Sequence, residues 1–154
     1  RTEQLIERGL TIQKREYARN WHEQTRPYDG IDDLLEELHH KDVRLAVLSN
    51  KDDSFAQQCM AFFFRHTAFD RIQGFSEEIP PKPDPKGALM VADHLRLAPR
   101  EIIFLGDSEV DMATALAAGM YPAGALWGFR SERELVTAGA SCTIHRPLDL
   151  LRLF

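Results

Sequence analysis

The sequence predicts an α/β protein in which helices cover a parallel, doubly wound sheet in three layers. Short apolar runs of strand length alternate with segments of helical periodicity. Polar residues directly follow the apolar runs at 43–48 and 102–105. A chain of 154 residues is long enough to bury one ordinary core. Strand–helix alternation is typical of a parallel sheet, whose ligands bind beyond the carboxyl ends of the strands.

Each element follows from local signals in chain order. Residues 2–24 show partly regular helical spacing of apolar side chains, and RPYDG at 26–30 is a turn signal and the best candidate for a hinge. The sequence IPPKPDP at 79–85 is predicted as a stiff loop, because proline interrupts helix interiors and central strands. The other predicted elements are helices over 31–40, 53–64, 86–95, 112–118 and 131–138, and strands over 43–48, 68–74, 102–105, 121–127 and 142–144.

Composition and charge exclude several classes of protein. Contents of 44% hydrophobic and 28% charged residues are typical of a globular chain. A net charge of -5 without a dense Lys/Arg patch offers no basic face to nucleic acid, and the apolar runs are too short to span a membrane. Cys59 and Cys142 lack metal-ligand spacing. We expect buried thiols in a reducing cytoplasm, with a single distant disulfide as the alternative.

Polar side chains gather where the predicted strands end. GDSEVD at 106–111 places Asp107 at a strand's carboxyl end and Asp111 one helical turn further on, so both carboxylates face one crevice. Hard oxygen ligands there suit Mg²⁺ that holds a phosphate. Ser49 follows another strand, and Lys82 is held between prolines. A hydroxyl, helix-start N–H groups, a lysine and a metal ion are what cleavage of a phosphate ester requires.

Each of these residues also has an ordinary structural explanation. Asp107 and Ser49 are both residue types that cap helices, and Lys82 alone is a solvated surface lysine. Asp111 alone is a first-turn acid that the helix dipole favours. Their occurrence together, in this order and at strand ends, is what favours a phosphate site.

Three sequences resemble motifs two, three and four of the haloacid dehalogenase superfamily, and most closely its phosphoglycolate phosphatase branch. They are LSNK at 48–51, KPDP at 82–85 and GDSEVD at 106–111. WGFR at 127–130 is also typical of that branch. The resemblance implies an Mg²⁺-dependent phosphatase that acts on 2-phosphoglycolate or a similar small phosphate ester.

The resemblance also assigns roles to five residues. It implies that Ser49 binds the phosphoryl group, that Asn50 shapes and lines the same phosphate-binding loop, and that Lys82 bridges phosphate and nucleophile. Asp107 is the expected Mg²⁺ ligand, and Asp111 supports the metal's waters or Lys82. The expected catalytic set is therefore Lys82, Ser49 and Asp111.

The resemblance further divides the chain into parts. Residues 1–25 are expected to be the remnant of a helical cap, 26–30 the hinge, and 31–154 the α/β core. We expect a small phosphorylated metabolite as the partner, no nucleic acid and no membrane, and we leave a homodimer open.

The superfamily's first motif, Asp-x-Asp-Gly-Thr after an N-terminal strand, does not occur in this sequence. The resemblance implies that its first Asp attacks phosphorus and that its strand lies between the strands at 43–48 and 102–105. We therefore expect the core without its central first strand, the aspartyl-phosphate residue outside this sequence, and essentially no activity from these residues alone. A start at Arg1 inside a helical pattern leads us to expect an incomplete natural polypeptide.

Three arrangements of the two flanking strands follow from that expectation. The strands at 43–48 and 102–105 pair directly, receive a strand from another chain, or receive one from a further segment of the same protein. We favour the last, because open strand edges leave backbone groups unpaired.

Other functions stay open at this point. One is a pseudo-phosphatase or phosphate-binding interaction domain without a nucleophile, and another is a haloacid dehalogenase or a sugar-phosphate mutase. Two acids within 106–111 favour a metal and hence phosphoryl transfer. A receiver domain shares the topology but is disfavoured, because here the lysine precedes the two acids.

Overall fold

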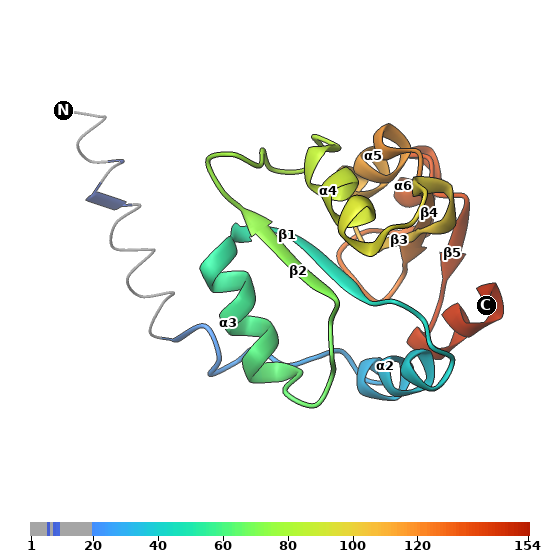
Figure 1. Cartoon of the computed structure of the whole chain (residues 1–154), viewed down its shortest axis with the longest axis horizontal. Coiled ribbons are helices and arrows are strands. Elements are labelled where there is room, and N and C mark those ends of the chain that lie inside the picture. The colour runs from blue at the N-terminus through green and yellow to red at the C-terminus, as the bar shows by residue number, and fades with distance from the viewer. Residues whose placement is uncertain (1–5, 7, 10–19) are drawn as a thin grey trace.

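The computed structural model describes residues 6, 8–9 and 20–154 of the chain. Most of the helix predicted over 2–24 therefore lies outside the described residues. The described part runs from α2 (Ile31–His40) to a C-terminal 3-10 helix, η2 (Pro147–Leu153), and Figure 1 shows its course.

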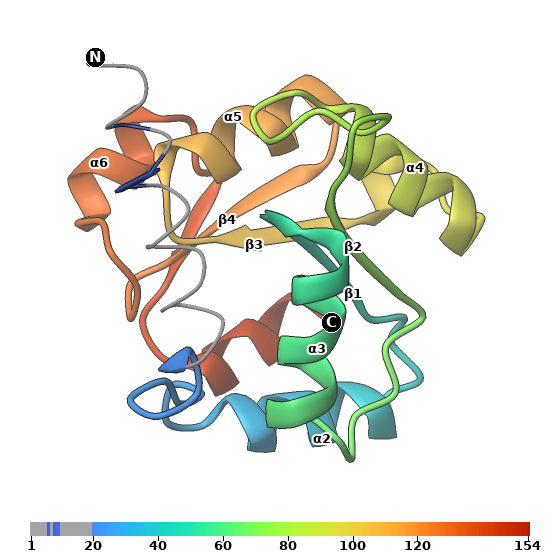
Figure 2. The same cartoon turned by 90° about the vertical axis from the view of Figure 1, so that its left-hand side faces the viewer.

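Helices lie on both sides of the strands, in three layers. In Figure 2, α4 (Lys86–Leu95) and α5 (Glu109–Ala118) lie on one side of β3 (Ile103–Gly106) and β4 (Tyr121–Ala125), and α2 lies on the other side. This arrangement confirms the predicted α/β fold. None of the described helices is long and apolar enough to cross a membrane.

All named strands pair in parallel, as predicted. β1 (Ala46–Asp52) pairs with β2 (Arg71–Phe75), and β4 pairs with both β3 and β5 (Cys142–Ile144). Within the described residues the strands form two separate sheets, β1-β2 and β3-β4-β5, so β1 and β3 do not pair directly.

Strand ends differ from prediction more than helix ends do. α2, α4 and α3 (Asp53–Phe63) match the predicted helices within one residue. β1 begins three residues later than predicted and continues through 49–51, where we expected it to stop. The reason is pairing: after a register irregularity that follows Leu48, the ladder to β2 resumes at Asp52.

The C-terminal elements show smaller differences. α5 starts at Glu109, three residues before the predicted helix, because Ser108 caps it. α6 (Glu132–Thr137) and β5 agree with prediction. Two 3-10 helices were not predicted, η1 (Pro99–Glu101) and η2.

The core consists of two apolar clusters on opposite faces of β3. Ile103 and Leu105 pack against a cluster that contains Leu34 and Leu38 of α2. Their neighbours in sequence, including Phe104, pack against a second cluster, which contains Ala88 and Ala92 of α4 and Ala115 and Ala118 of α5. This alternation is the period-two pattern of a strand covered on both faces.

The cysteines match the prediction in part. Cys59 and Cys142 are both free, so the disulfide alternative is wrong. Both are half-buried rather than buried. Desolvation raises the pKa of the Cys59 thiol, and the nearby charge of Lys51 offsets part of that rise.

Candidate active site

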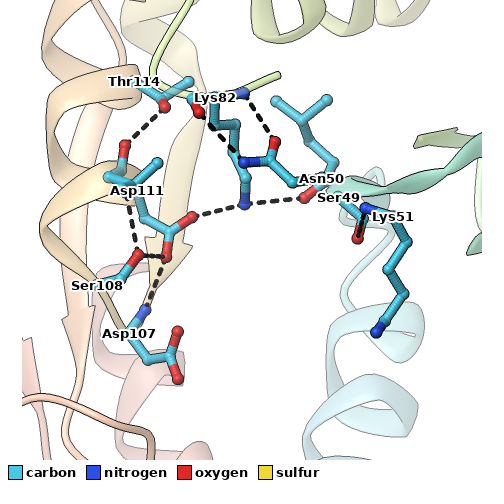
Figure 3. Close-up of polar contacts among 10 residues, drawn as sticks. Ser49, Asn50, Lys51, Lys82, Asp107, Ser108, Asp111 and Thr114 are labelled. Atoms are coloured by element: carbon cyan, nitrogen blue, oxygen red, sulfur yellow. Dashed lines mark hydrogen bonds and ion pairs between the residues drawn. The ribbon is translucent and has the colours of Figure 1, made fainter. Parts of the chain in front are cut away.

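Lys82 links β1 of one sheet to α5, the helix that follows β3 of the other sheet. Its Nζ donates to Leu48 O of β1 at 3.2 Å and to Asp111 Oδ1 of α5 at 2.6 Å. The side chains of Lys82 and Asp111 are only 15% and 7% exposed, so water screens this ion pair weakly. Figure 3 shows the lysine between the two elements. The Lys82 ammonium, which we predicted to contact phosphate, is therefore held in position by two hydrogen-bond partners.

Asn50 holds the loop that carries Lys82. Its Nδ2 donates to Lys82 O at 3.1 Å, and its Oδ1 accepts from Lys82 N at 2.7 Å. These reciprocal bonds join the end of β1 to the Pro-rich loop (Figure 3). Prolines on both sides of Lys82 already restrict that loop, so little further ordering is needed to place the lysine.

Asp111 is buried and accepts hydrogen bonds at both oxygens. Besides Lys82, it accepts from Ser108 Oγ at 2.5 Å and from Asp107 N at 3.2 Å, both at Oδ2. Ser108 is the N-cap of α5, and its Oγ in turn accepts from Asp111 N. A Cβ at position 106 would lie 2.2 Å from Asp111 Cβ, which explains why glycine precedes the acid.

Asp107 points into the same region from the end of β3. Its Oδ2 accepts from the backbone N–H of Phe129 at 3.1 Å. Among the described residues, Oδ1 has no hydrogen-bond partner and is open to a ligand. Gly128 lies against this carboxyl group, because a Cβ there would come within 2.2 Å of Asp107 Oδ2.

An exposed ion pair fixes the loop that supplies the Phe129 N–H. Arg130 donates in a fork to Glu109, with Nε–Oε2 at 2.7 Å and Nη2–Oε1 at 3.1 Å. The hydrogen bond from Arg130 lowers the pKa of Glu109, and the same bond raises the pKa of Arg130. The pair joins the loop after β4 to the first turn of α5.

Ser49 lies on the β1 side of the site. Its Oγ accepts from Lys51 N at 3.2 Å, and it does not cap α3, whose N-cap is Asp52. The helix-cap explanation of Ser49 is therefore wrong. Figure 3 shows Ser49 on the β1 side of Lys82 and Asp107 on the opposite side.

Hydrogen bonds thus join four of the five predicted residues, Asn50 to Lys82, Lys82 to Asp111, and Asp111 to the backbone of Asp107, while Ser49 Oγ accepts from Lys51 N. The structure adds Ser108 and the 128–129 backbone, which hold Asp111 and Asp107 in place. A serine between a strand and a helix is a visible cap signal, whereas a contact made by a backbone N–H leaves no trace in the sequence.

The donor set fits Mg²⁺ in its chemistry. Mg²⁺ is bound by one or two carboxylates together with substrate phosphate and water, and the open Oδ1 of Asp107 is such a ligand. The described residues contain no group of three His, Cys, Asp or Glu side chains that could hold a metal by themselves. Asp111 is engaged by Lys82, which leaves Asp107 as the ligand of choice.

Several curated relatives of this chain are named phosphoglycolate phosphatase. One from Aquifex aeolicus is 29% identical over 147 residues, which are 96% of this chain and 68% of that protein. One from Pseudomonas putida is 30% identical over 140 residues, which are 91% of this chain and 51% of that protein. The chain spans about half the length of most of the curated phosphoglycolate phosphatases that it matches.

Solved structures share the fold. A candidate phosphoglycolate phosphatase from Lactobacillus delbrueckii matches with a TM-score of 0.92 at 31% identity, over 97% of this chain and 62% of that one. A haloacid dehalogenase-like family protein from Streptococcus pneumoniae matches with a TM-score of 0.76 at 31% identity, over 84% of this chain and 60% of that one.

The family model of haloacid dehalogenase-like hydrolases matches residues 2–125. The match includes the ends of β1 and β3 and the loop with Lys82, which are the parts that form the site. This chain belongs to the haloacid dehalogenase-like hydrolase family.

Proposed function

We propose that this chain carries the phosphate-binding core of an Mg²⁺-dependent phosphatase that hydrolyses 2-phosphoglycolate or a similar small phosphate ester. One observation carries the proposal: Lys82 Nζ is fixed between the carbonyl of Leu48, the residue before Ser49 in β1, and Asp111, whose Oδ2 accepts from Asp107 N. Fixed donors and cations aimed at one point are what stabilise a transferring phosphoryl group. The names of the relatives support the choice of substrate.

Each residue has a role that follows from its contacts. Lys82 offsets the negative charge of a phosphoryl group, and Asn50 and Asp111 hold the lysine in place. The Ser49 hydroxyl donates to a phosphoryl oxygen while continuing to accept from Lys51 N. Asp107 holds Mg²⁺, which when bound supplies further positive charge for the phosphoryl oxygens.

The covalent nucleophile is proposed to lie outside the 154 residues. Asp111 is paired with Lys82, and Asp107 is needed for the metal, so neither carboxylate of this site is free to attack phosphorus. Removal of a covalent nucleophile typically costs several orders of magnitude in rate. The residues described above therefore bind a phosphate ester but turn it over very slowly by themselves.

Titration of the ¹⁵N-labelled chain with 2-phosphoglycolate in the presence of Mg²⁺ tests the proposal. We expect the amide resonances of Ser49, Asn50 and Lys82 to shift in a saturable manner. Lys82→Met retains the apolar stem but removes the charge, so it should abolish these shifts. Lys86→Met is the matched control, since Lys86 begins α4 directly after the same Pro-rich loop and its ammonium bonds Glu78 O instead of Leu48 O and Asp111.

Two results would contradict the proposal. One is equal binding of 2-phosphoglycolate by the Lys82→Met and Lys86→Met variants. The other is equally tight binding of glycolate, which has the carboxylate but no phosphate.

Release of inorganic phosphate, with and without Mg²⁺, separates a phosphatase from the dehalogenase and mutase alternatives. A chain that binds phosphate but shows no phosphatase activity even when supplied with a nucleophile-bearing segment would support the pseudo-phosphatase alternative.

A further inference from the structure

The direction of the Asp107 carboxyl group is set by the loop that follows β4. Its Oδ2 accepts from the backbone N–H of Phe129 at 3.1 Å, and within residues 20–154 no other hydrogen bond reaches this carboxylate. Figure 3 shows the carboxyl group turned away from Lys82 and Asp111. An Asp side chain rotates about its χ1 and χ2 bonds, so the hydrogen bond from Phe129 decides where the open Oδ1 points.

The loop lies directly against this carboxyl group. A Cβ at position 128 would come within 2.2 Å of both Cβ and Oδ2 of Asp107, so Gly128 is what permits the close approach of the backbone. Phe129 is 84% exposed, so its own ring does little to hold the loop in place. The position of the Phe129 N–H therefore depends on another anchor.

A fork of two hydrogen bonds supplies that anchor. Arg130, the residue after Phe129, donates to Glu109, with Nε–Oε2 at 2.7 Å and Nη2–Oε1 at 3.1 Å. Glu109 lies two positions after Asp107, at the start of α5. The fork therefore ties the loop that carries the donor to the segment that carries the acceptor.

The exposure of this ion pair argues for a role in geometry. The side chains of Arg130 and Glu109 are 42% and 54% exposed, and ion pairs so open to water contribute little to the free energy of folding. A two-point contact between a guanidinium and a carboxylate still adds geometric specificity.

The fork also keeps a positive charge away from Asp107. The hydrogen bond to Glu109 is the main cause of the raised pKa of Arg130, and the charge of Asp107 adds to the rise, so the guanidinium lies within electrostatic range of Asp107. A guanidinium released from Glu109 would be attracted to the Asp107 carboxylate and would compete with a metal ion for it.

We propose that Arg130 and Glu109 are positioning residues for the metal ligand. Their fork holds the 128–129 backbone against Asp107, so that Oδ2 stays bonded to the Phe129 N–H and Oδ1 is presented to Mg²⁺. The inference rests on the proposed function, in which Asp107 holds Mg²⁺. It adds two exposed residues that act on the metal ion through Asp107 alone.

Two measurements on the 154-residue chain test the proposal, and the first needs no metal. Glu109→Gln/Arg130→Met breaks the fork and leaves the net charge near Asp107 unchanged. Solvent exchange of the Phe129 amide, measured by NMR, should become about fivefold faster or more, the effect of one net hydrogen bond. The matched control is Arg44→Met/Asp70→Asn, which breaks an exposed ion pair of 2.6 Å before β1 and β2 and should leave this exchange rate unchanged.

The second measurement uses Mn²⁺, which suits the same oxygen ligands as Mg²⁺ and broadens the amide resonances of nearby residues. We expect saturable broadening over 106–111 in the unmodified chain, and an affinity for Mn²⁺ about fivefold weaker in the fork variant. Gly128→Ala changes no charge and should also weaken binding, because its Cβ displaces Asp107. Broadening at the exposed acids of α2 serves as the internal reference and should be equal in all variants.

Two outcomes would overturn the inference while the metal site itself stands. One is an unchanged exchange rate of the Phe129 amide in the fork variant, since the fork would then not hold the loop. The other is faster exchange with an unchanged affinity for Mn²⁺, since the hydrogen bond would then not direct the metal ligand.

A third outcome concerns the proposed function as well. If 106–111 show no saturable broadening in the unmodified chain, Asp107 is not the metal ligand, which contradicts the proposed function and overturns the inference with it. Circular dichroism checks that each variant is folded. If Gly128→Ala does not fold, the fork variant and its control decide the question.

Discussion

At the scale of single residues, the contacts of Asp111 favour one of the two roles that the sequence left open for it. The resemblance allowed this acid to support either the metal's waters or Lys82. In the structure Oδ1 bonds Lys82, and Oδ2 accepts from Ser108 and from the Asp107 backbone. These contacts favour the second role, in which Asp111 positions the lysine.

The charge of Asp111 should matter strongly for stability. Asp111→Asn leaves the nearly buried ammonium of Lys82 without a counter-charge, and breaking such a pair costs about 3 kcal/mol or more of unfolding free energy. Urea denaturation measures the loss. Glu109→Gln is the control, since it breaks an exposed ion pair on the same helix and should cost far less. Equal losses of unfolding free energy in the two variants would mean that the Lys82–Asp111 ion pair stabilises the fold no more than the exposed Arg130–Glu109 pair does.

The candidate residues of the site could be predicted from the sequence, but the hydrogen bonds between them could not. Asp107, Lys82 and Ser49 were predicted because they follow predicted strands or stand between prolines. The reciprocal bonds between Asn50 and Lys82 span 32 positions and depend on how the loop returns to β1. Contacts of that kind are set by tertiary packing and leave no local pattern.

At the scale of elements, helices were predicted more accurately than strands. α2 and α4 have clear apolar periodicity and start directly after a Gly-containing turn and a Pro-rich loop. β1 instead continues through Ser-Asn-Lys, residue types that usually mark turns, because the ladder to β2 resumes beyond them. Strand limits depend on the partner strand, which a local pattern does not contain.

The capping box of α6 predicts a pH effect. Ser131 Oγ and N both donate to Glu134, at 2.6 and 2.9 Å, and these bonds lower the pKa of Glu134. A carboxyl group with a lowered folded-state pKa stabilises the fold above its unfolded pKa, about 4.3 for Glu. That stabilisation is lost as the pH falls through the lower folded-state value.

Glu134→Ala should therefore destabilise the protein at neutral pH, with a difference from wild type that shrinks as the pH is lowered from about 4.3. Urea denaturation across this pH range measures it. Glu36→Ala, at an exposed position of α2, controls for loss of a helical carboxylate. A difference between Glu134→Ala and wild type that stays constant with pH would contradict the capping role.

At the scale of the whole molecule, the site depends on two sheets that are held at a fixed separation. Lys82 reaches Leu48 and Asp111 over 34 and 29 positions of sequence, and its two bonds join β1 of one sheet to α5, which follows β3 of the other. Strand–helix alternation predicted parallel strands, but it could not show that β1 and β3 stay apart. Only the family resemblance led us to expect that these two strands do not pair with each other.

The buried side chain of Trp21 packs the segment before α2 against α3. It is 6% exposed and makes edge-to-face contacts with Phe55, Phe62 and Phe63 of α3, at 5.2 to 5.5 Å between ring centroids. Trp21→Ala should cost about 3–5 kcal/mol of unfolding free energy, the usual loss for a buried aromatic side chain.

The neighbouring residue provides the control for this prediction. His22→Ala removes an exposed ring that touches Trp21 and Phe62 and should cost much less. Amide exchange distinguishes two ways in which Trp21→Ala can act. If Trp21 only fastens residues 20–26 to α3, exchange rises in α3 and leaves β3, β4 and β5 unchanged. If exchange rises equally in all of them, Trp21 belongs to the cooperative core, and the site at the strand ends depends on a contact made before the hinge.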